Sequence, residues 1–312
     1  MSQSIAQYRE RLRAMDGQRV LRNRTIDGVE LSSAAHGPLL TIVTVSFNAE
    51  RALSRTIQSV MEQTYRNIEY VIIDGGSTDG TVGIIREWEH VLSYWHSAKD
   101  RGISDAFNLG IAAAQGTYVA FVNSDDWMSK NQAEAAIAAL QRTGAAFCFG
   151  RLALHDQDGK LKYYMDGKEQ YWTDIRWRMP HINHPTVVMR RDAYERLGGF
   201  ALNRRIAMDY DLHLRAELAG LRGMYVPEIV GHMSEGGVCH AQWDVGLREV
   251  REIATAQTGA WFRPWWSYFS RLWRGRIRVG LGYVTPKWFV DAIHRAINPR
   301  YLPLGPQDNK DE

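Results

Sequence analysis

Three short runs of apolar residues alternate with amphipathic stretches through the first half of the chain. The runs are mostly β-branched or aromatic, which is typical of strands buried on both faces, and they cover residues 40–48, 68–73 and 118–122. Apolar positions at helical spacing fill the intervals, over residues 53–61, 81–88 and from Ile103 onward. This alternation predicts an α/β fold in which helices flank a mostly parallel sheet with right-handed crossovers.

A polar cluster follows each predicted strand. Ser46-Phe47-Asn48 ends the first strand, residues 74–81 follow the second, and Asn123-Ser124-Asp125-Asp126 follows the third. Ligands of open parallel sheets bind beyond the carboxyl ends of the strands, and carboxylates there suit Mg²⁺ or Mn²⁺. The last cluster has an alternative interpretation as a turn before a helix, with Ser124 or Asp125 as the N-cap.

The loop at residues 74–81 also has two interpretations. Its first carboxylate can accept a hydrogen bond from a nucleobase N–H, and its glycines let a ligand approach the backbone. Equally, the loop can form only a turn and a helix cap. It is neither a P-loop nor a dinucleotide-binding glycine motif. Downstream, Lys99 and Arg101 are placed to neutralise phosphate at a helix N-terminus, or are solvated surface charges.

Composition narrows the class of protein. The 312 residues are 45% hydrophobic and 23% charged, which is typical of a globular chain, and the net charge of +3 gives no general case for polyanion binding. Cys148 and Cys239 stand far apart without metal-ligand spacing, which favours a reducing cytoplasm over a disulfide framework. The charged N-terminus predicts no secretory signal, and no apolar run approaches the ~20 residues that span a bilayer.

The C-terminal part is aromatic and basic. Residues 261–300 contain eight Lys or Arg against one acidic residue, Asp291. Helical spacing places two sets on different faces: Phe262, Trp266, Phe269 and Trp273, and Arg263, Arg271, Arg274 and Arg278. This pattern favours a helix in the membrane interface. The alternatives are packing on the main domain and a dimer contact. Nucleic-acid binding is disfavoured because no recognition motif accompanies the charge.

Five blocks of residues stand in a fixed order. They are residues 44–48, 73–81, 100–108 and 123–126, followed by a downstream set at 181–186, 198–200 and 208–215. Together they resemble the family 2 glycosyltransferases of GT-A fold, and most of all the bacterial enzymes that build exopolysaccharide or O-antigen repeat units. We therefore expect an N-terminal extension at 1–38, a GT-A catalytic domain at 39–240 and a helical, amphipathic extension at 241–312.

The resemblance implies a nucleotide-sugar site on the matched residues. Phe47 would lie against a uracil-type base, and Asp74 would accept a hydrogen bond from the N–H of that base. The other residues on this side would be Val45, Ser46, Asn48, Asp100, Arg101, Asn108, Asn123 and Ser124.

The resemblance also implies a divalent metal site. Asp125 matches the metal ligand of the DxD motif, with Asp126 beside it and His232 as a further candidate. Asn123 stands where the family has its first Asp, so it brings no charge to the metal. From the residues alone, His232 can instead be a hydrogen-bonded structural imidazole.

On the acceptor side, Asp209 matches the catalytic base, although Met208 replaces the usual Glu. His184 and Asp211 would lie on the same side. Two alternatives stay open from the residues themselves. Asp209 can be the N-cap of a helix that carries Leu212, and His184 can be a structural imidazole.

The implied enzyme is inverting and depends on Mg²⁺ or Mn²⁺. It would move a sugar from a nucleoside-diphosphate donor, with UDP favoured, to a polyprenyl-diphosphate-linked saccharide. It would be cytoplasmic, peripheral at the inner face of the plasma membrane, and the tail is compatible with a homodimer. The alternatives are a nucleotidyltransferase, which would want a basic glycine-rich loop after the first strand, and a weakly catalytic binding or scaffold protein, suggested by Asn123 and Met208.

Overall fold

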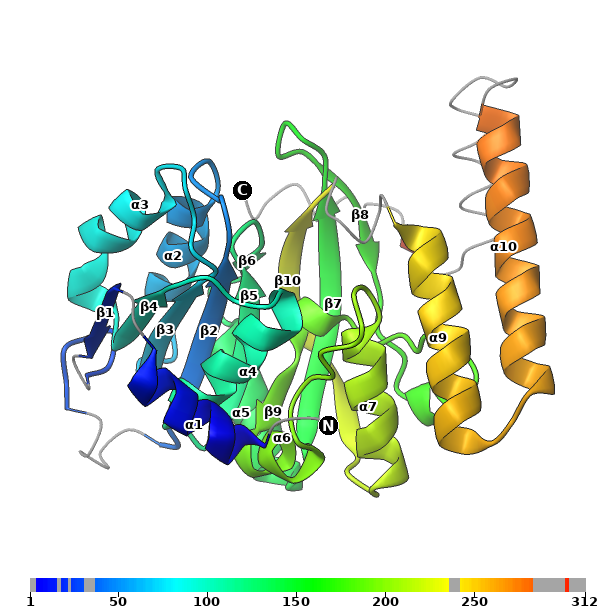
Figure 1. The fold of residues 1–312 in the computed structure, drawn as a ribbon, viewed down its shortest axis with the longest axis horizontal. Coiled ribbons are helices and arrows are strands. Elements are labelled where there is room, and N and C mark those ends of the chain that lie inside the picture. The colour runs from blue at the N-terminus through cyan, green and yellow to red at the C-terminus, as the bar shows by residue number, and fades with distance from the viewer. Residues whose placement is uncertain are drawn as a thin grey trace.

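The computed structural model describes residues 4–15, 18–21, 24–30, 37–235, 242–282 and 301–302. These residues build one sheet with strand order β1-β4-β3-β2-β5-β9-β7-β10-β6, to which β8 and β11 attach through β7 (Figure 1). The strands are β1 (Gln18–Leu21), β2 (Leu40–Ser46), β3 (Ile68–Asp74), β4 (Tyr94–Ser97), β5 (Tyr118–Asn123), β6 (Trp127–Met128), β7 (Phe147–His155), β8 (Leu161–Met165), β9 (Val188–Arg190), β10 (Gly223–Ser234) and β11 (Tyr301–Leu302).

Parallel pairing dominates the half of the sheet that contains the predicted strands. β4, β3, β2 and β5 are parallel neighbours, as are β7 and β10, whereas β9 lies antiparallel between β5 and β7. The predicted mostly parallel sheet is therefore confirmed. The first strand ends at Ser46 rather than Asn48, because Asn48 adopts a left-handed backbone with φ 51°.

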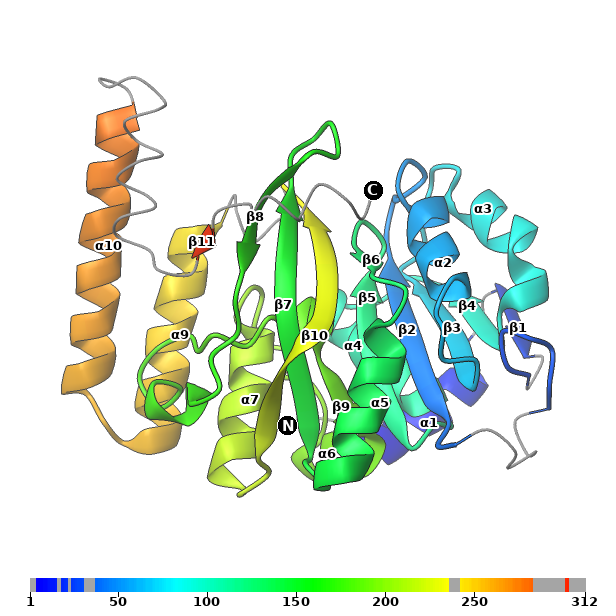
Figure 2. The same cartoon turned by 180° about the vertical axis from the view of Figure 1, so that it is seen from behind.

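Helices cover both faces of the sheet (Figures 1 and 2). One face carries α2 (Leu53–Met61), α3 (Thr81–Glu87) and α5 (Gln132–Thr143); the other carries α1 (Ile5–Ala14), α4 (Ile103–Ala113), α6 (Arg191–Leu197), α7 (Met208–Leu218) and α9 (Trp243–Thr258). Strand side chains alternate between the faces, so Leu40 and Ile42 of β2 enter one core while Val43 and Val45 enter the other. This double burial explains why the strands are apolar at successive positions.

The N-terminal residues contribute to the same core and sheet. α1 packs against α4 and buries Ile5, Tyr8 and Leu12. Its first turn is closed by a capping box between Ser4 and Gln7, in which each side chain accepts from the other residue's backbone N–H. β1 pairs antiparallel with β4 at the edge of the sheet.

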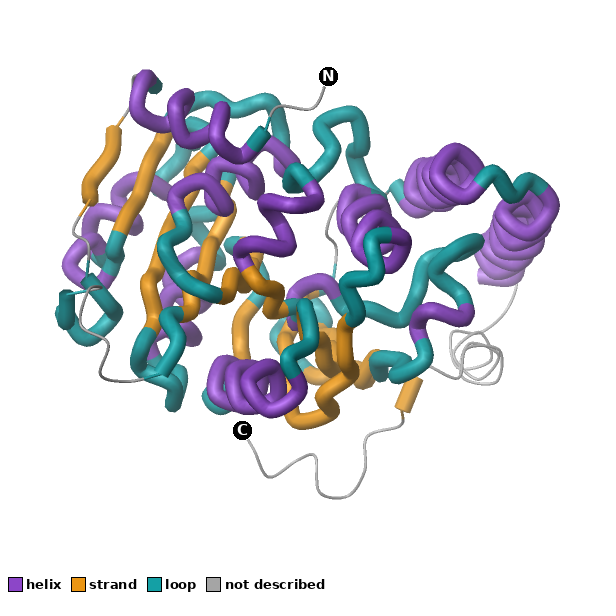
Figure 3. The backbone as a smooth tube through the Cα atoms, turned by 90° about the horizontal axis from the view of Figure 1, so that it is seen from below, coloured by secondary structure: helices purple, strands orange, loops and turns teal. Residues whose placement is uncertain are grey.

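α10 (Phe262–Gly282) lies beside α9 at the end of the molecule farthest from β1 (Figures 1 and 3). The guanidinium of Arg251 on α9 stacks on Trp265 at 4.2 Å and on Tyr268 at 4.8 Å. Burial lowers the pKa of Arg271 to about 10, and Asp174 interacts with it electrostatically. In α10 and the residue before it, six aromatic side chains are exposed: Trp261, Phe262, Trp265, Trp266, Phe269 and Trp273.

None of the described helices combines the length and the apolar character that crossing a bilayer requires. Cys148 is buried and unpaired. Cys239 and the side chain of Arg278 lie outside the described part of the chain.

Candidate active site

Hydrogen bonds join the loop after β2 to the loop after β3. The backbone N–H of Asn48 donates to Ser77 Oγ (2.8 Å), and the N–H of Thr78 donates to Asn48 Oδ1 (3.0 Å). Farther along, the N–H of Gly80 donates to Glu50 Oε2 (2.9 Å). These loops follow adjacent parallel strands, so the bonds hold two of the predicted site motifs in a fixed relation.

The buried side chain of Asp74 accepts the hydrogen bonds that hold the loop after β3 in place. Its side chain is fully buried and accepts from the hydroxyls of Ser46 (2.9 Å), Ser77 (2.6 Å) and Ser97 (2.7 Å). It also accepts from the backbone N–H groups of Gly76 (3.1 Å) and Ser77 (2.9 Å). A nucleobase N–H would have to displace one of these donors to reach Asp74.

Phe47 and Asp100 both lie close to Gly75. The Phe47 side chain is 64% exposed, whereas Val45 is buried in the core. A Cβ at Gly75 would lie 2.8 Å from Asp100 Oδ2 and 3.4 Å from Phe47 Cδ2, so the glycine lets these two side chains approach the backbone. Burial raises the pKa of Asp100, whose Oδ1 accepts from the N–H of Gly102 (2.8 Å). A flat ring with an N–H donor fits this combination of aromatic face and carboxylate.

Arg101 points into a cluster around Asp105 on α4. Its Nη2 donates to Asp105 Oδ1 (2.7 Å), Arg11 of α1 binds both carboxylate oxygens (2.7 and 2.8 Å), and Tyr8 Oη donates at 2.9 Å. Burial alone would raise the pKa of Asp105, but the hydrogen bonds from Arg11 and Arg101 hold it at about 2. The guanidinium of Arg101 is therefore committed to a protein carboxylate in this structure.

Asn108 is likewise engaged by the protein. Its Nδ2 donates to the Phe200 carbonyl (2.9 Å), and its Oδ1 accepts from the Phe200 N–H (2.7 Å). A Cβ at Gly199 would lie 2.3 Å from Asn108 Oδ1, so the glycine makes this approach possible. Asn108 thus joins α4 to the segment that leads into α7.

The turn at residues 123–126 leaves two oxygens unpaired beside an exposed carboxylate. Asn123 Nδ2 donates to Asp126 Oδ2 (2.9 Å), while Asn123 Oδ1 and Asp126 Oδ1 are buried without a hydrogen-bond partner. Asp125 is exposed, and the carbonyls of Ser124 and Asp126 accept from Thr56 Oγ1 (3.0 and 2.7 Å). The chain then enters β6 rather than a helix, so the alternative of an N-cap at Ser124 or Asp125 is wrong.

This turn fits a hard divalent cation. Burial, and then the charge of Asp125, raise the pKa of Asp126 well above its ordinary value, and a bound cation would oppose both effects. The amide oxygen of Asn123 and the two carboxylates form the all-oxygen donor set that Mg²⁺ and Mn²⁺ take. Among the described residues no group of three or more His, Cys, Asp or Glu side chains is gathered to hold a metal.

His232 sits in a polar chain next to this turn. One ring nitrogen bonds Ser129 Oγ (2.8 Å) and the other bonds His155 Nε2 (3.0 Å), so both are occupied by protein partners. The ring stacks on Trp127 (5.1 Å, 8°), and the Arg55 guanidinium lies 3.7 Å from the centre of a Trp127 ring. Burial lowers the pKa of His232 to about 4, with His155 and Arg55 acting in the same direction.

Arg55 itself was not identified from the sequence. Its Nη2 donates to the Asp125 carbonyl (3.3 Å) and to Ser234 Oγ (3.1 Å), which places a cation at the edge of the turn. In the sequence it is a polar position in a helix, and no motif marks it. The pairing of β6 with β10 brings Trp127 opposite His232, and that contact becomes visible only in the fold.

Asp209 lies in the first turn of α7 with little of its hydrogen-bonding capacity used. Its Oδ1 accepts from the N–H of Tyr210 (2.7 Å), and burial raises its pKa. The helix N-cap is Ala207, so the alternative of Asp209 as the N-cap is wrong. Glu249 of α9 does the capping instead, by accepting the N–H groups of Arg205, Ile206 and Ala207, each at 2.9 Å.

Asp211 is held on another side of the same helix. Arg215 Nε donates to its Oδ2 (2.8 Å), and Gln257 Nε2 of α9 donates to its Oδ1 (2.7 Å). Its carboxylate is buried and serves to join α7 to α9.

A run of neighbouring side chains leads from the end of β5 toward Asp209. Because strand side chains alternate, Phe121 and Asn123 of β5 share a face. The His184 ring stacks on Phe121 with centroids 6.4 Å apart. His184 and Asp209 are in turn near enough for each to shift the pKa of the other. Phe121 and His184 therefore connect the strand that ends at Asn123 with the neighbourhood of Asp209.

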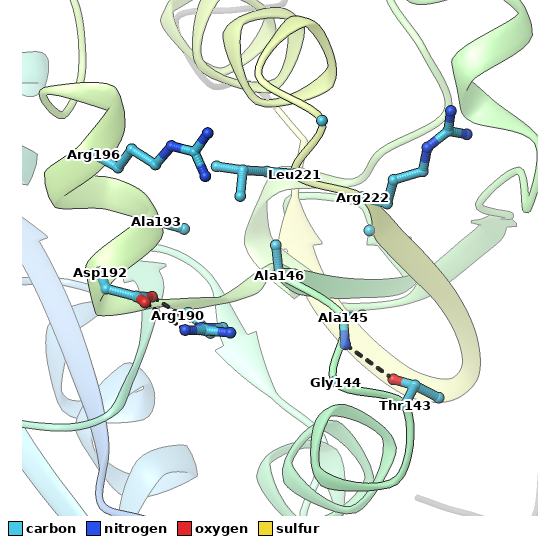
Figure 4. Close-up of a pocket in the computed structure, with 12 residues that line it drawn as sticks. Thr143, Gly144, Ala145, Ala146, Arg190, Asp192, Ala193, Arg196, Leu221 and Arg222 are labelled. Atoms are coloured by element: carbon cyan, nitrogen blue, oxygen red, sulfur yellow. Dashed lines mark hydrogen bonds and ion pairs between the residues drawn. The ribbon is translucent and has the colours of Figure 1, made fainter.

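A cleft of about 510 Å³ lies elsewhere, between α5, α6 and the start of β10 (Figure 4). Three of its lining residues are Arg190, Arg196 and Arg222, and Asp192 pairs with Arg190. None of the predicted site residues lines it.

Comparison with known proteins shows the family of this chain. The model of glycosyl transferase family 2 matches residues 41–205. An uncharacterized glycosyltransferase of Mycobacterium tuberculosis is 29% identical over 265 residues, covering 76% of this chain and 95% of that protein. The putative teichuronic acid biosynthesis glycosyltransferase TuaG of Bacillus subtilis is 34% identical over 159 residues, which are 50% of this chain and 63% of TuaG.

Solved structures share the fold. The S. aureus TarS fragment 1–349 in complex with UDP-GlcNAc aligns with a TM-score of 0.54 and 17% identity, over 69% of this chain and 66% of that one. The mannosyltransferase PcManGT of Pyrobaculum calidifontis, in complex with GDP-Man and Mn²⁺, aligns with a TM-score of 0.57 and 15% identity, over 95% and 87%. With the family model spanning more than half of its length, this chain belongs to glycosyl transferase family 2 and is a glycosyltransferase.

Proposed function

We propose that this chain is an inverting, divalent-metal-dependent glycosyltransferase that moves a sugar from a nucleoside-diphosphate donor to a hydroxyl of a lipid-linked saccharide in bacterial surface polysaccharide synthesis. One observation carries the proposal: Phe121 of β5, the strand that leads into the Asp125 turn, contacts His184, and Asp209 interacts electrostatically with His184. The Asp125 turn supplies oxygen ligands for a cation, and Asp209 supplies a base. Transfer from a diphosphate to an alcohol needs both.

On the donor side, Phe47 and Asp100 beside Gly75 would bind the base. A uracil ring can stack on the exposed Phe47 and donate its N–H to Asp100. Asp100 suits this role better than Asp74, whose carboxylate already accepts five hydrogen bonds. Relatives of the same fold hold UDP-GlcNAc and GDP-Man, which supports a nucleotide-sugar donor.

At the diphosphate, Asp125 with the oxygens of Asn123 and Asp126 would hold Mg²⁺ or Mn²⁺. When bound, the ion acts as a Lewis acid that stabilises charge on the departing diphosphate. PcManGT has Mn²⁺ in its complex. The Arg55 guanidinium at the edge of this turn adds a fixed positive charge.

On the acceptor side, Asp209 would remove the proton from the attacking hydroxyl. Asp211 is committed to Arg215 and Gln257, which leaves Asp209 as the uncommitted carboxylate of α7's first turn. The site has one proposed base and no residue that we propose as a covalent nucleophile, which favours a single displacement. A single displacement inverts the configuration at the anomeric carbon.

The exposed aromatic residues of α10 support peripheral attachment at the inner face of the plasma membrane. Trp266, Phe269 and Trp273 are largely exposed, and Arg263 and Arg274 are exposed on the same helix. Such a surface can bury tryptophans among lipid headgroups while arginines meet anionic lipid. An acceptor carried on a polyprenyl diphosphate would be reached from that position.

Release of nucleoside diphosphate tests the proposal. The chain would be incubated with UDP- and GDP-sugars and with bacterial lipid-linked oligosaccharides in vesicles, in Mn²⁺ or in EDTA. We expect UDP release that requires both metal and acceptor, and that Asp125→Asn loses. Asp158→Asn, which changes an exposed carboxylate elsewhere, is the matched control. UDP binding by thermal shift without release from any donor would favour a non-catalytic binding protein instead.

A further inference from the structure

The helix that follows β2 carries polar side chains on its buried side. Thr56 and Ser59 stand three residues apart in α2, and Gln63 follows four residues later, just after the helix ends. Spacings of three and four place side chains along one side of a helix. These three residues are buried, with exposed fractions of 0%, 8% and 1%, and we call them the polar stripe of α2. Buried polar groups are normally paired, so the partners of this stripe show what it does.

The first member of the stripe bonds the turn at residues 123–126. Thr56 Oγ1 is within hydrogen-bond distance of two carbonyl oxygens, those of Ser124 (3.0 Å) and Asp126 (2.7 Å). The carbonyl between them, that of Asp125, accepts from Nη2 of Arg55, the residue before Thr56 (3.3 Å). Two adjacent residues of α2 therefore hold three consecutive carbonyls of the turn.

The other two members bond the chain that leads from the turn to α5. The N–H of Met128 in β6 donates to Ser59 Oγ (3.2 Å). Gln63 Nε2 donates to the carbonyl of Ser129 (2.9 Å), and Gln63 Oε1 accepts from the N–H of Ala133 (3.0 Å). A later residue of the stripe thus binds a later part of the chain. The stripe therefore fixes the whole segment along α2.

The side chains that would hold the cation depend on the backbone of this turn. Within the described part of the chain, the hydrogen bonds of Asp125 involve its carbonyl, so its carboxylate is placed through the backbone. Asn123 Oδ1 and Asp126 Oδ1 are buried and have no hydrogen-bond partner among the described residues. A divalent cation needs oxygens at set distances. A cluster of oxygens that is already in place loses less conformational entropy when the ion binds.

We propose that Thr56 is a positioning residue for the metal site, and that the polar stripe of α2 holds the turn in the conformation that a divalent cation needs. The proposal rests on the proposed function, which assigns the cation to this turn. Thr56 acts through the carbonyls of Ser124 and Asp126 rather than by contact with the ion. An apolar side chain in its place would leave these carbonyls without this donor, and the turn could then relax away from α2.

Calorimetric titration with Mn²⁺ in the presence of UDP tests the role of Thr56 without any sugar transfer. Thr56→Val keeps the shape of the side chain and removes the hydroxyl, so it should weaken Mn²⁺ binding by about 10–100-fold, as the loss of a group that orients metal ligands typically does. Thr56→Ser keeps the hydroxyl and should bind Mn²⁺ nearly as the wild type does. Ser59→Ala removes the next bond of the stripe and should weaken binding in the same direction. Wild-type Mn²⁺ affinity in Thr56→Val, or in Ser59→Ala if Thr56→Val does not fold, would overturn the proposal.

Thr44→Val separates positioning from a general loss of stability. Thr44 of β2 is also fully buried, and its hydroxyl bonds that of Tyr70 (3.0 Å), so this variant loses a buried hydrogen bond away from the turn. In thermal unfolding, added Mn²⁺ should raise the melting temperature of Thr44→Val more than that of Thr56→Val. Equal weakening of Mn²⁺ binding in both variants would overturn the role of Thr56. A wild type that binds no Mn²⁺ refutes the metal dependence in the proposed function and this inference with it, whereas Mn²⁺ binding without transfer refutes the proposed function alone.

Discussion

Burial raises the pKa of both Asp126 and Asp209, yet their neighbours give the two carboxylates different uses. Asp126 follows Asp125 and accepts from Asn123, so a cation bound between these groups would relieve the repulsion between the two carboxylates. Asp209 has the N–H of Tyr210 as its donor and no acidic neighbour among the causes of its shift. A carboxylate with a raised pKa and spare oxygen lone pairs suits general-base work.

Asp209→Asn should abolish most of the transfer while the donor still binds. General-base catalysis typically contributes about 10²–10⁴-fold, and the amide keeps the shape of the side chain. The rate of UDP release and the thermal shift with UDP measure the two quantities separately. If Asp209→Asn lost UDP release and UDP binding equally, or kept a turnover near that of the wild type, Asp209 would not be the base.

The dependence of transfer on pH should carry the signature of a buried base. Asp209 must be ionised to accept a proton, and its pKa lies above the ordinary 3.8, so activity should be lost as pH falls through that raised value. Protonation of Asp126 would weaken metal binding in the same direction. Measuring kcat/KM at saturating Mn²⁺ at each pH separates the protonation of Asp209 from the loss of metal that protonation of Asp126 would cause. An acid limb at the pKa of a free aspartate would contradict the assignment.

Single residues also show where sequence reasoning stops. Asp125 and Asp209 could be singled out because each matches a motif position with a defined chemical role. The motif positions Arg101 and Asn108 turned out to contact Asp105 and Phe200. Those partners follow from how α1 and the segment before α7 pack on α4, and neither helical periodicity nor residue type records such contacts.

At the scale of elements, the structure contains the three strands that the apolar runs predict, β2, β3 and β5. They could be predicted because burial on both faces requires apolar residues at successive positions. β9 and β6 are too short to leave such a pattern, although β9 joins the two halves of the sheet and β6 brings Trp127 to His232. The polar chain through His155 and His232 was therefore beyond prediction.

Gly75→Ala should weaken UDP binding without unfolding the chain. The new Cβ would lie 2.8 Å from Asp100 Oδ2 and 3.4 Å from Phe47 Cδ2, so Asp100 would have to shift. We expect a loss of roughly tenfold, the lower end of the roughly 1–3 kcal/mol that overpacking costs. Calorimetric titration with UDP measures it. Gly83→Ala is the control, because nothing lies within 4 Å of its added Cβ and alanine favours helix α3. Equal UDP affinity in both variants would place the base elsewhere.

The docking of α1 on α4 can be tested with two arginines of the same helix. Arg11 binds the buried Asp105, whereas Arg9 pairs with a partly exposed Glu195. Arg11→Met should lower the free energy of unfolding by about 1–3 kcal/mol, and Arg9→Met by less than about 1 kcal/mol. Denaturant unfolding at neutral pH measures both.

The ion pair between Arg11 and Asp105 also predicts how the stability of the chain depends on pH. The folded pKa of Asp105, about 2, is below its ordinary 3.8, so its ion pairs stabilise the chain above the unfolded pKa. The difference between wild type and Arg11→Met should shrink as pH falls from about 4 toward 2. A difference that persists at pH 2 would point to packing of the Arg11 stem rather than charge.

At the scale of the whole molecule, the aromatic surface of α10 should direct the chain to lipid. We expect it to float with vesicles that contain anionic lipid, and the triple variant Trp266→Ser, Phe269→Ser, Trp273→Ser to lose most of that binding. Leu218→Ser removes an exposed apolar side chain of α7 and is the control. Wild-type flotation by the triple variant, or a concentration-dependent dimer that the variant abolishes, would instead assign this surface to a protein contact.

The place of β10 in the sheet has a consequence for the choice of an expressed fragment. The match to the family ends at residue 205, yet β10, which pairs with both β7 and β6, is made of residues that come later. Asp209 and the cap supplied by Glu249 come later as well. A fragment that stopped at residue 205 would leave β7 without its partner strand β10 and would lack Asp209, the proposed base. The shortest fragment worth expressing therefore runs from α1 through α9.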